Sequence, residues 1–252
     1  MTVDAVVLAG GRNSLEMAAA TGAENRALTP LGSRTMLDYV VSALSETPSV
    51  GQIVTVGNVP QSGIYTQVTG RETLLENLLA GLDAAGDQER VLVSTSDIPF
   101  VTAEALEDFV LRATATDADL CCSYVPLAVC IQKYPEMKRT AVRLAEGRFT
   151  LGNVMLVNPR FLRTRQAAIT EAYAARKSPM QVARLLGFSL LLRLLGAQIA
   201  VPGLLSIPAL EGAVSRALGG RAAGICSAYA EIGTDVDKPE DVKIARRILS
   251  GS

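Results

Sequence analysis

The residues that could do chemistry in this chain are carboxylates and arginines, because its 252 residues include no histidine. The absence of histidine excludes Ser-His-Asp triads, Cys-His pairs and histidine-based metal sites. Catalysis is left to carboxylates, cationic side chains, backbone dipoles and a hard metal ion. Three segments carry such residues, and they lie near the start, in the middle and near the end of the sequence.

The first segment follows an apolar run at residues 5–9, after which the chain continues as Gly10-Gly11-Arg12. A buried strand that ends in two glycines predicts a phosphate-holding turn, because glycines let backbone N–H groups approach an anion and Arg12 adds charge. Arg26 brings a second cation to the end of the same loop. A glycine turn with two solvated arginines is the alternative. The spacing matches neither G-x-G-x-x-G nor a P-loop.

The second segment is Ser96-Asp-Ile-Pro99, which follows a predicted strand at residues 91–93. In a parallel sheet, ligands gather at the carboxyl ends of the strands, so Asp97 is expected on the same rim as Gly10 and Gly11. A carboxylate at this place can hold Mg²⁺ that bridges substrate phosphates. An ordinary loop aspartate before a proline turn is the alternative.

The third segment, residues 233–241, is the densest acidic cluster in the sequence. Asp235 and Asp237 have the period of an extended chain, so their side chains should face one side. Two roles are open for Asp237. It could cap a helix that begins at Lys238-Pro239, in a capping box, or it could be a second metal-binding carboxylate opposite Asp97.

Strands and helices alternate through residue 125, which predicts a doubly wound α/β fold with a largely parallel sheet. The predicted strands are residues 5–9, 53–56, 91–93 and 120–125, and the predicted helices are 35–44, 73–85 and 102–115, with an irregular loop at 10–34. Beyond residue 125 we expect short strands at 142–144 and 153–157, a helical block at 160–195, a helix at 207–218, strands at 222–227 and 231–232, and a terminal helix at 239–249.

Composition restricts the partners. The formal net charge of −1 argues against a nucleic-acid surface. The four cysteines lack C-x-x-C spacing, and no signal peptide opens the chain, so we expect free thiols and a cytoplasmic protein. The apolar residues 182–207 carry two arginines and are broken by glycines, so a membrane span is not expected there. A packed core, a hydrophobic acceptor site and a homodimer face remain open for them.

Four motifs together resemble MobA-like nucleotidyltransferases in their order and spacing. They are Leu8-Ala-Gly-Gly-Arg12, Arg26-Ala-Leu-Thr-Pro-Leu-Gly32, Ser96-Asp-Ile-Pro99 and Asp235-Val-Asp-Lys-Pro-Glu-Asp241. The resemblance covers residues 4–125 and 150–245, and it extends more distantly to sugar-phosphate and methylerythritol-phosphate nucleotidyltransferases.

The resemblance implies a GT-A-type fold, with a mixed, mostly parallel sheet and a helical C-terminal elaboration. It also implies transfer of an NMP group from an NTP to a phosphorylated small molecule, with Mg²⁺ or Mn²⁺ bound and pyrophosphate released. Carried over by position, the nucleotide would be bound by Arg12 and by the backbone of Leu8, Ala9, Gly10 and Gly11. The metal would be bound by Asp97 and Asp237, and Asn153 would lie on the acceptor side.

This chain departs from the family pattern at one of the candidate catalytic residues. Arg26 stands where the family usually has lysine, and the loop before it lacks the usual R-M-G-x-D. Arginine keeps the charge and offers a fork for phosphate, but the two residues are not interchangeable. We expect Arg12, Arg26 and the metal on Asp97 and Asp237 to stabilise the charge that develops on the α-phosphate and the leaving pyrophosphate.

Basic clusters in the second half of the chain are candidates for holding the acceptor phosphate. They are Lys138-Arg139, with Arg143 nearby, and Arg176-Lys177, which precedes a predicted helix. From these clusters we select Arg139 and Lys177, with solvated surface charge as the alternative.

We expect a single domain over residues 1–252: a nucleotide-binding half at 1–125, an acceptor-side elaboration at 126–230 and a return segment at 231–252. Two other activities are open. One is a GT-A glycosyltransferase that uses a finished sugar nucleotide, although such enzymes typically show D-x-D at the end of a mid-chain strand. The other is a non-catalytic nucleotide-binding regulator.

Overall fold

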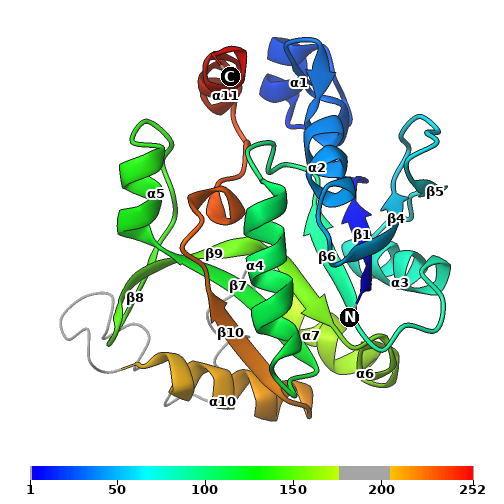
Figure 1. Ribbon diagram of the computed structural model, residues 1–252, viewed down its shortest axis with the longest axis vertical. Helices are drawn as coiled ribbons and strands as arrows, with labels where there is room; N and C mark the ends of the chain where they lie inside the picture. The colour runs from blue at the N-terminus through cyan, green and yellow to red at the C-terminus, as the bar shows by residue number, and fades with distance from the viewer. Residues whose placement is uncertain (1, 176–204, 252) are drawn as a thin grey trace.

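The computed structural model describes residues 2–175 and 205–251 (Figure 1). Within these residues an eight-stranded sheet has the order β10-β7-β9-β6-β1-β4-β5, and β8 pairs with β9. Strand β9 runs antiparallel to both its neighbours, β6 and β7, whereas the other pairs along this order are parallel. The strands are β1 (Val3–Leu8), β4 (Val50–Val56), β5 (Thr66–Val68), β6 (Val91–Thr95), β7 (Leu120–Pro126), β8 (Val142–Leu144), β9 (Gly147–Val157) and β10 (Ala222–Cys226).

Helices cover both faces of the sheet, as the alternation of strands and helices predicts. Val3, Ala5 and Val7 of β1 belong to a core with helices α2, α4 and α11. Val6, on the opposite face of the strand, belongs to a second core with α3 and α6. The helices that cover the sheet are α2 (Met36–Ser45), α3 (Leu74–Ala84), α4 (Ala103–Thr114), α6 (Pro159–Thr164), α7 (Gln166–Ala175), α10 (Ile207–Leu218) and α11 (Pro239–Ser250).

Three threonines begin the helices of the first half. The hydroxyl groups of Thr35, Thr73 and Thr102 accept hydrogen bonds from backbone N–H groups in the first turns of α2, α3 and α4. These bonds satisfy N–H groups that have no partner inside the helix. The predicted helix starts in this half are therefore confirmed.

The predicted loop at residues 10–34 is wrong in part. It contains helix α1 (Leu15–Thr21), the short helix η1 (Arg26–Leu28) and a small hairpin of β2 (Pro30–Leu31) and β3 (Arg34–Thr35). Helix α1 buries only Met17, so the sequence shows no apolar stripe there. Asparagine and serine side chains cap these short helices and replace the missing stripe as the stabilising feature.

The second half also differs from the prediction in three places. Residues 127–133 form helix α5 (Leu127–Lys133). Gly147 and Gly152 do not separate short strands, because both lie in one continuous strand, β9. Residues 230–233 form the short helix η3 (Ala230–Gly233) instead of a strand. Gly152 stays inside β9 because a Cβ there would lie 2.1 Å from Ser123 Oγ on the neighbouring strand.

The C-terminal segment lies against the N-terminal half. Figure 1 shows α11 (red) beside α1 (blue), and the backbone N–H of Val236 donates to the carbonyl of Asp97 at 2.8 Å. Upstream, the buried carboxylate of Glu231 pairs with Lys133 Nζ at 2.9 Å. The segment that carries Asp235 and Asp237 is thus held next to the end of β6.

No helix among residues 2–175 and 205–251 is long and apolar enough to cross a membrane. The apolar stretch singled out above lies almost wholly outside the described residues. The four cysteines are free thiols, as expected.

Candidate active site

The turn after β1 forms one wall of a cavity of about 890 Å³, called here the nucleotide-side cavity. The start of η1 holds the turn in place through two hydrogen bonds. Arg26 N donates to Gly11 O at 2.9 Å, and Nδ2 of the capping residue Asn25 donates to Ala9 O at 3.0 Å. The residues that line the cavity are Gly10, Gly11, Arg12, Glu24, Asn25, Asn58, Gly70, Arg71, Glu72 and Glu76.

Only part of the predicted nucleotide-binding turn reaches this cavity. Gly10, Gly11 and Arg12 line it, whereas Leu8 and Ala9 do not. The N–H and C=O groups of Ala9 are already bonded, to Val56 O and Asn25 Nδ2. The backbone available to an anion is therefore that of the two glycines.

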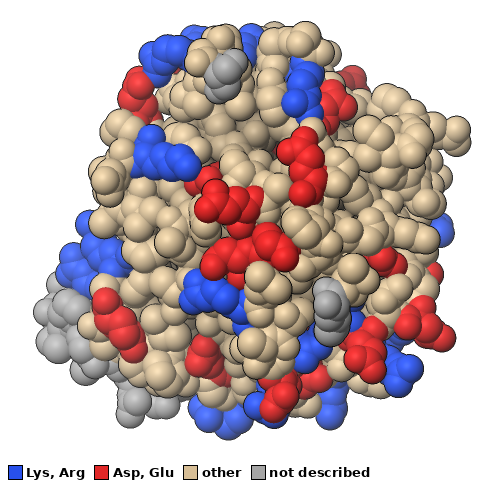
Figure 2. Space-filling view, in the orientation of Figure 1, with Lys and Arg blue, Asp and Glu red and all other residues tan. Residues whose placement is uncertain are grey.

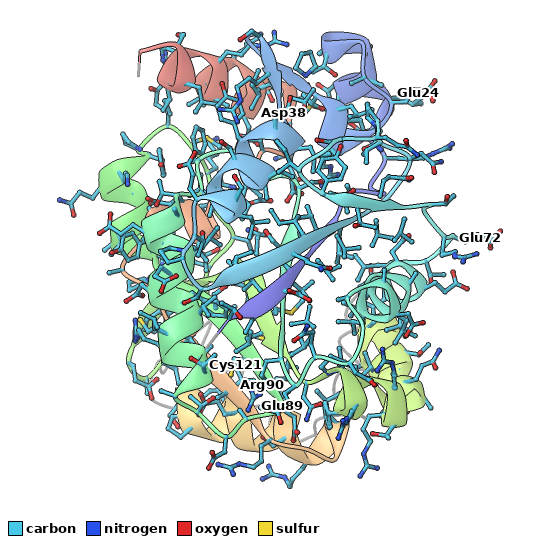
Figure 3. All side chains as sticks on the ribbon, turned by 45° about the vertical axis from the view of Figure 1, so that its right-hand side comes forward. Glu24, Asp38, Glu72, Glu89, Arg90 and Cys121 are labelled. Atoms are coloured by element: carbon cyan, nitrogen blue, oxygen red, sulfur yellow. The ribbon has the colours of Figure 1, made fainter. Side chains whose placement is uncertain are left out.

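Two close contacts hold the segments that border the nucleotide-side cavity. A Cβ on Gly57, whose φ is +156°, would lie 2.4 Å from the backbone of Ala9, so only glycine lets β4 approach the turn this closely. Asn77 bonds both N–H and C=O of Arg71 and so orders the loop before α3. Figure 3 shows Glu24 and Glu72 projecting outward on the same side of the molecule, from the loops after α1 and before α3.

Arg26 connects Asp97 and Asp237. Its Nη1 donates to Asp97 Oδ2 at 3.1 Å and to Asp237 Oδ1 at 2.5 Å. The side chains of Arg26, Asp97 and Asp237 are 29%, 14% and 45% exposed, so this cluster is partly withdrawn from water. Burial alone would lower the pKa of Arg26, but the charges of Asp237 and Asp97 raise it above its ordinary value.

Asp237 does not cap helix α11, so the capping alternative is wrong. The carboxylate that accepts the backbone N–H groups of Asp237 and Lys238 belongs to Asp241. The side chain of Asp237 is thereby free to point at Arg26, on the same side as Asp97. Both aspartates that the motifs select therefore meet at one place, although they are far apart in sequence.

A second arginine holds the remaining aspartate of the motif. Arg139, whose side chain is 6% exposed, donates from Nη1 to Asp235 Oδ1 at 2.6 Å and from Nη2 to the Asp235 carbonyl at 2.8 Å. Burial, together with the charges of Asp97 and Asp237, raises the pKa of Asp235 to about 6, against the opposing effect of Arg139. Asp235 therefore takes up a proton at a higher pH than an ordinary aspartate does.

A second cavity, of about 810 Å³, lies beyond these aspartates and is called here the acceptor-side cavity. Asn153 lines it and donates from Nδ2 to Ile232 O at 3.3 Å. Lys177 lies outside the described residues. The residues that line the cavity are Glu136, Lys138, Arg139, Thr140, Val142, Thr150, Leu151, Gly152, Asn153, Asp235, Asp237, Lys238, Glu240, Asp241 and Ile244.

The aspartates fit a hard divalent cation in donor type. Asp97 Oδ1 is buried and has no hydrogen-bond partner among the described residues, and carboxylate oxygens are the ligands that Mg²⁺ prefers. Across the part of the chain that the structure describes, no three acidic or thiol side chains converge as a ready-made metal group. Arg26 Nη1 lies between Asp97 and Asp237 instead.

Some residues of the site carry no clear signal in the sequence. Asp235 stands out only as part of a motif, and its pairing with Arg139 spans two distant segments. Asn58, Arg71 and Asn77 belong to no motif, and β5, which precedes Arg71, is three residues long and too short to recognise by alternation. The glycine beside Arg71 is the available signal for a loop near a ligand.

The charged side chains on one face of the molecule are not arranged as on a polynucleotide-binding surface. On the face seen in Figure 2, acidic side chains gather near the centre while Lys and Arg are scattered around them. This face therefore carries no extended basic surface.

The sheet order, the antiparallel strand β9 and the cavities at the carboxyl ends of β1 and β6 define a nucleotide-diphospho-sugar transferase fold. Residues 5–183 match the model of the MobA-like NTP transferase domain, and the chain belongs to this family. The chain is 35% identical to a hypothetical transferase from Thermus thermophilus, with a TM-score of 0.84 over 96% of this chain and 100% of that chain.

More distant solved structures share the fold. The 2-C-methyl-D-erythritol 4-phosphate cytidylyltransferase from Thermus thermophilus is 18% identical, with a TM-score of 0.57 over 99% of this chain and 100% of that one. The CMP:2-keto-3-deoxy-manno-octonic acid synthetase, solved in complex with CTP, is 11% identical, with a TM-score of 0.59 over 100% and 99%. A search among curated proteins found no match.

Family membership makes the protein a nucleotidyltransferase. The resemblance in the motifs and the expected fold class are confirmed. The glycosyltransferase and regulator alternatives are not supported.

Proposed function

We propose that this enzyme transfers an NMP group from an NTP to a phosphorylated small molecule and releases pyrophosphate. The observation that carries the proposal is the position of Arg26, Asp97 and Asp237. Arg26 is bonded through its backbone to the wall of the nucleotide-side cavity, and its guanidinium reaches Asp237, which lines the acceptor-side cavity. An NTP in one cavity and an acceptor in the other would meet at this point.

In the proposed reaction, an acceptor phosphate oxygen attacks the α-phosphorus in line. A new P–O bond forms as the bond between the α-phosphorus and the bridging oxygen breaks, and the electron pair leaves with pyrophosphate. The attacking oxygen is already anionic, so the protein needs no general base, which suits a chain without histidine.

The arginines of the site would bind and orient the phosphates. Gly10 and Gly11 offer backbone N–H groups and Arg12 offers charge at the nucleotide-side cavity. Arg139 and Asn153 line the opposite cavity and are the proposed acceptor contacts, together with Lys177. Preorganised cations and dipoles that meet developing charge lower the barrier because they need not reorganise.

Asp97 and Asp237 are the proposed ligands for Mg²⁺ or Mn²⁺, which when bound would supply Lewis-acid neutralisation of phosphate charge. The buried, unpartnered Oδ1 of Asp97 supports this role. The same proposal treats residues 1–252 as one domain, with the nucleotide half at 1–125, the acceptor elaboration at 126–230 and the return segment at 231–252. The free thiols favour a cytoplasmic location.

A pyrophosphate-release assay tests the function. We would measure release from each of the four NTPs in the presence of a panel of phosphorylated acceptors and Mg²⁺. The Asp97→Asn variant should lose activity by about 10²- to 10³-fold. Asp117→Asn is the control, because Asp117 is an exposed aspartate paired with Arg221. NTP binding without turnover on any acceptor, or full activity in Asp97→Asn, would count against the proposal.

A further inference from the structure

Among the described residues, Arg26 makes two side-chain ion pairs, both through a single atom, Nη1. Its Nε is buried and has no hydrogen-bond partner among the described residues, and the same holds for Asp97 Oδ1. The guanidinium therefore does not use its fork geometry on either carboxylate. Arg–carboxylate pairs are frequently bidentate. In this contact, Nε of Arg26 and Oδ1 of Asp97 remain without a hydrogen-bond partner among the described residues.

The same carboxylates are the proposed ligands of the divalent cation. Asp97 and Asp237, which accept from Arg26 through Oδ2 and Oδ1, are the side chains that would hold the cation. A cation and a guanidinium repel each other and compete for the same lone pairs. A cation held by these carboxylates would therefore weaken their pairing with Arg26, and Arg26 would weaken the binding of the cation.

We infer that Arg26 is a resident counter-ion of the carboxylates, which a divalent cation must displace and which the nucleotide's polyphosphate draws away. The second half of this inference rests on the proposed function, whereas the competition with the cation does not. Metal binding in the free enzyme is weakened by Arg26 and recovers when phosphates take the guanidinium.

The local structure allows the side chain to change partners while the backbone stays in place. Arg26 N is bonded to Gly11 O at 2.9 Å, and Asn25 caps η1 through the N–H of Ala27 at 2.9 Å. The backbone of Arg26 thus stays next to the glycine turn. A planar fork of donors suits phosphate oxygens better than a single ammonium does, which gives the arginine a purpose at this position.

Arg12 differs from Arg26 and provides a matched control. It is exposed and lines the nucleotide-side cavity, and no ion pair of Arg12 is found within residues 2–175 and 205–251. Removing Arg12 changes the net charge as much as removing Arg26 does. Only the removal of Arg26 should vacate the carboxylates.

The first test measures binding of Mn²⁺ alone, without nucleotide, by electron paramagnetic resonance of the free ion. The Arg26→Gln variant should bind Mn²⁺ about tenfold more tightly than the wild type, and Arg12→Gln should stay within about threefold. Equal affinity in the wild type and Arg26→Gln would overturn the inference. Near-UV circular dichroism checks the fold, and Arg26→Met, which keeps the aliphatic stem, replaces Arg26→Gln if that variant does not fold.

The second test concerns the phosphates and uses a double-mutant cycle in EDTA. A fluorescent NTP analogue is titrated into the wild type, Arg26→Gln, Asp237→Asn and the double variant. Asp237→Asn should tighten metal-free binding severalfold when Arg26 is present, and much less when Arg26 is absent. An equal gain on both backgrounds would show that Asp237 acts only by repulsion. Neither test requires turnover. A failure of the proposed reaction can therefore be distinguished from a failure of this inference.

Discussion

The two cavities of the site are of similar size but are built in different ways. The nucleotide-side cavity is lined by residues 10–76, with glycines and asparagines prominent among them. The acceptor-side cavity is lined by residues 136–153 and 235–244, with many charged side chains. One cavity is thus built from the first third of the chain and has Gly10, Gly11 and Gly70 in its lining, whereas the other joins two segments that are distant in sequence.

This difference suits the two substrates that we propose. All four NTPs carry the same triphosphate, and a backbone that approaches closely can hold it with little dependence on side-chain type. Acceptors differ in structure, and a cavity lined by side chains can change without disturbing the strands. The predictions below test this contrast, from the largest expected effect to the smallest.

The acceptor side should depend most on the buried ion pair of Arg139 with Asp235. Replacing Arg139 with glutamine leaves a partly buried carboxylate without its partner and should lower the free energy of unfolding by about 3–4 kcal/mol in urea denaturation. The matched control is Arg247→Gln, because Arg247 forms an exposed pair with Glu136, which lines the same cavity. Similar losses in both variants would contradict a special role for burial.

The nucleotide side should depend on close backbone approach. Gly57→Ala places a methyl group against the backbone of Ala9, and we expect a loss of about 2–3 kcal/mol in unfolding free energy, with weaker NTP binding. Gly63→Ala is the control, because a Cβ at Gly63 meets no atom within 4 Å. If Gly57→Ala bound NTP as tightly as the wild type, the turn would not be held in the way described.

The positive charge of Arg12 in the nucleotide-side cavity should affect the KM for NTP but not the KM for the acceptor. Arg12→Gln should raise the KM for NTP by about ten- to hundredfold, the usual effect of losing a hydrogen bond to a charged group. The KM for the acceptor should stay unchanged, since Arg12 does not line the acceptor-side cavity. Steady-state kinetics with each substrate varied in turn measure both values, and a parallel rise in the two would remove the distinction between the cavities.

The acceptor side should also carry a small pH dependence of stability. The pKa of Asp235, raised to about 6 in the folded protein, lies above its ordinary value, so between about pH 4 and 6 the folded state binds the extra proton. Its contribution to stability is therefore present at low pH and is lost as the pH rises through 6. Because the side chain of Asp235 is partly exposed and Arg139 opposes the shift, the effect should be on the order of 1 kcal/mol.

Asp235→Asn should remove this contribution, as measured by urea denaturation at a series of pH values. Asp117→Asn, at an exposed pair with Arg221, is the control. A profile for Asp235→Asn that follows the wild type throughout would show that another group is responsible.

Much of the first half of the fold can be predicted because its signals are local. Apolar strands and threonine-capped helices are readable within a few residues, which is why β1, α2, α3 and α4 follow from the sequence. Helix α1 and strand β5 escape prediction because they are short and bury little. The sequence pattern predicts a break in strand β9 at Gly152, because glycine is typical of turns. In the structure, Gly152 lies inside the strand, since any larger residue there would collide with Ser123 on the neighbouring strand.

The sequence by itself determined which residue types can act here: carboxylates and arginines, two glycines after a buried strand, and no histidine. Tertiary structure decided how they combine. The bond from Val236 to Asp97 brings the two distant acidic motifs together, and Asp241, not Asp237, takes the helix cap. Arg26 could then lie between two carboxylates that the motifs assign to a metal. The sequence shows which residue types are present and how far apart they stand, but only packing determines which charged side chains become neighbours.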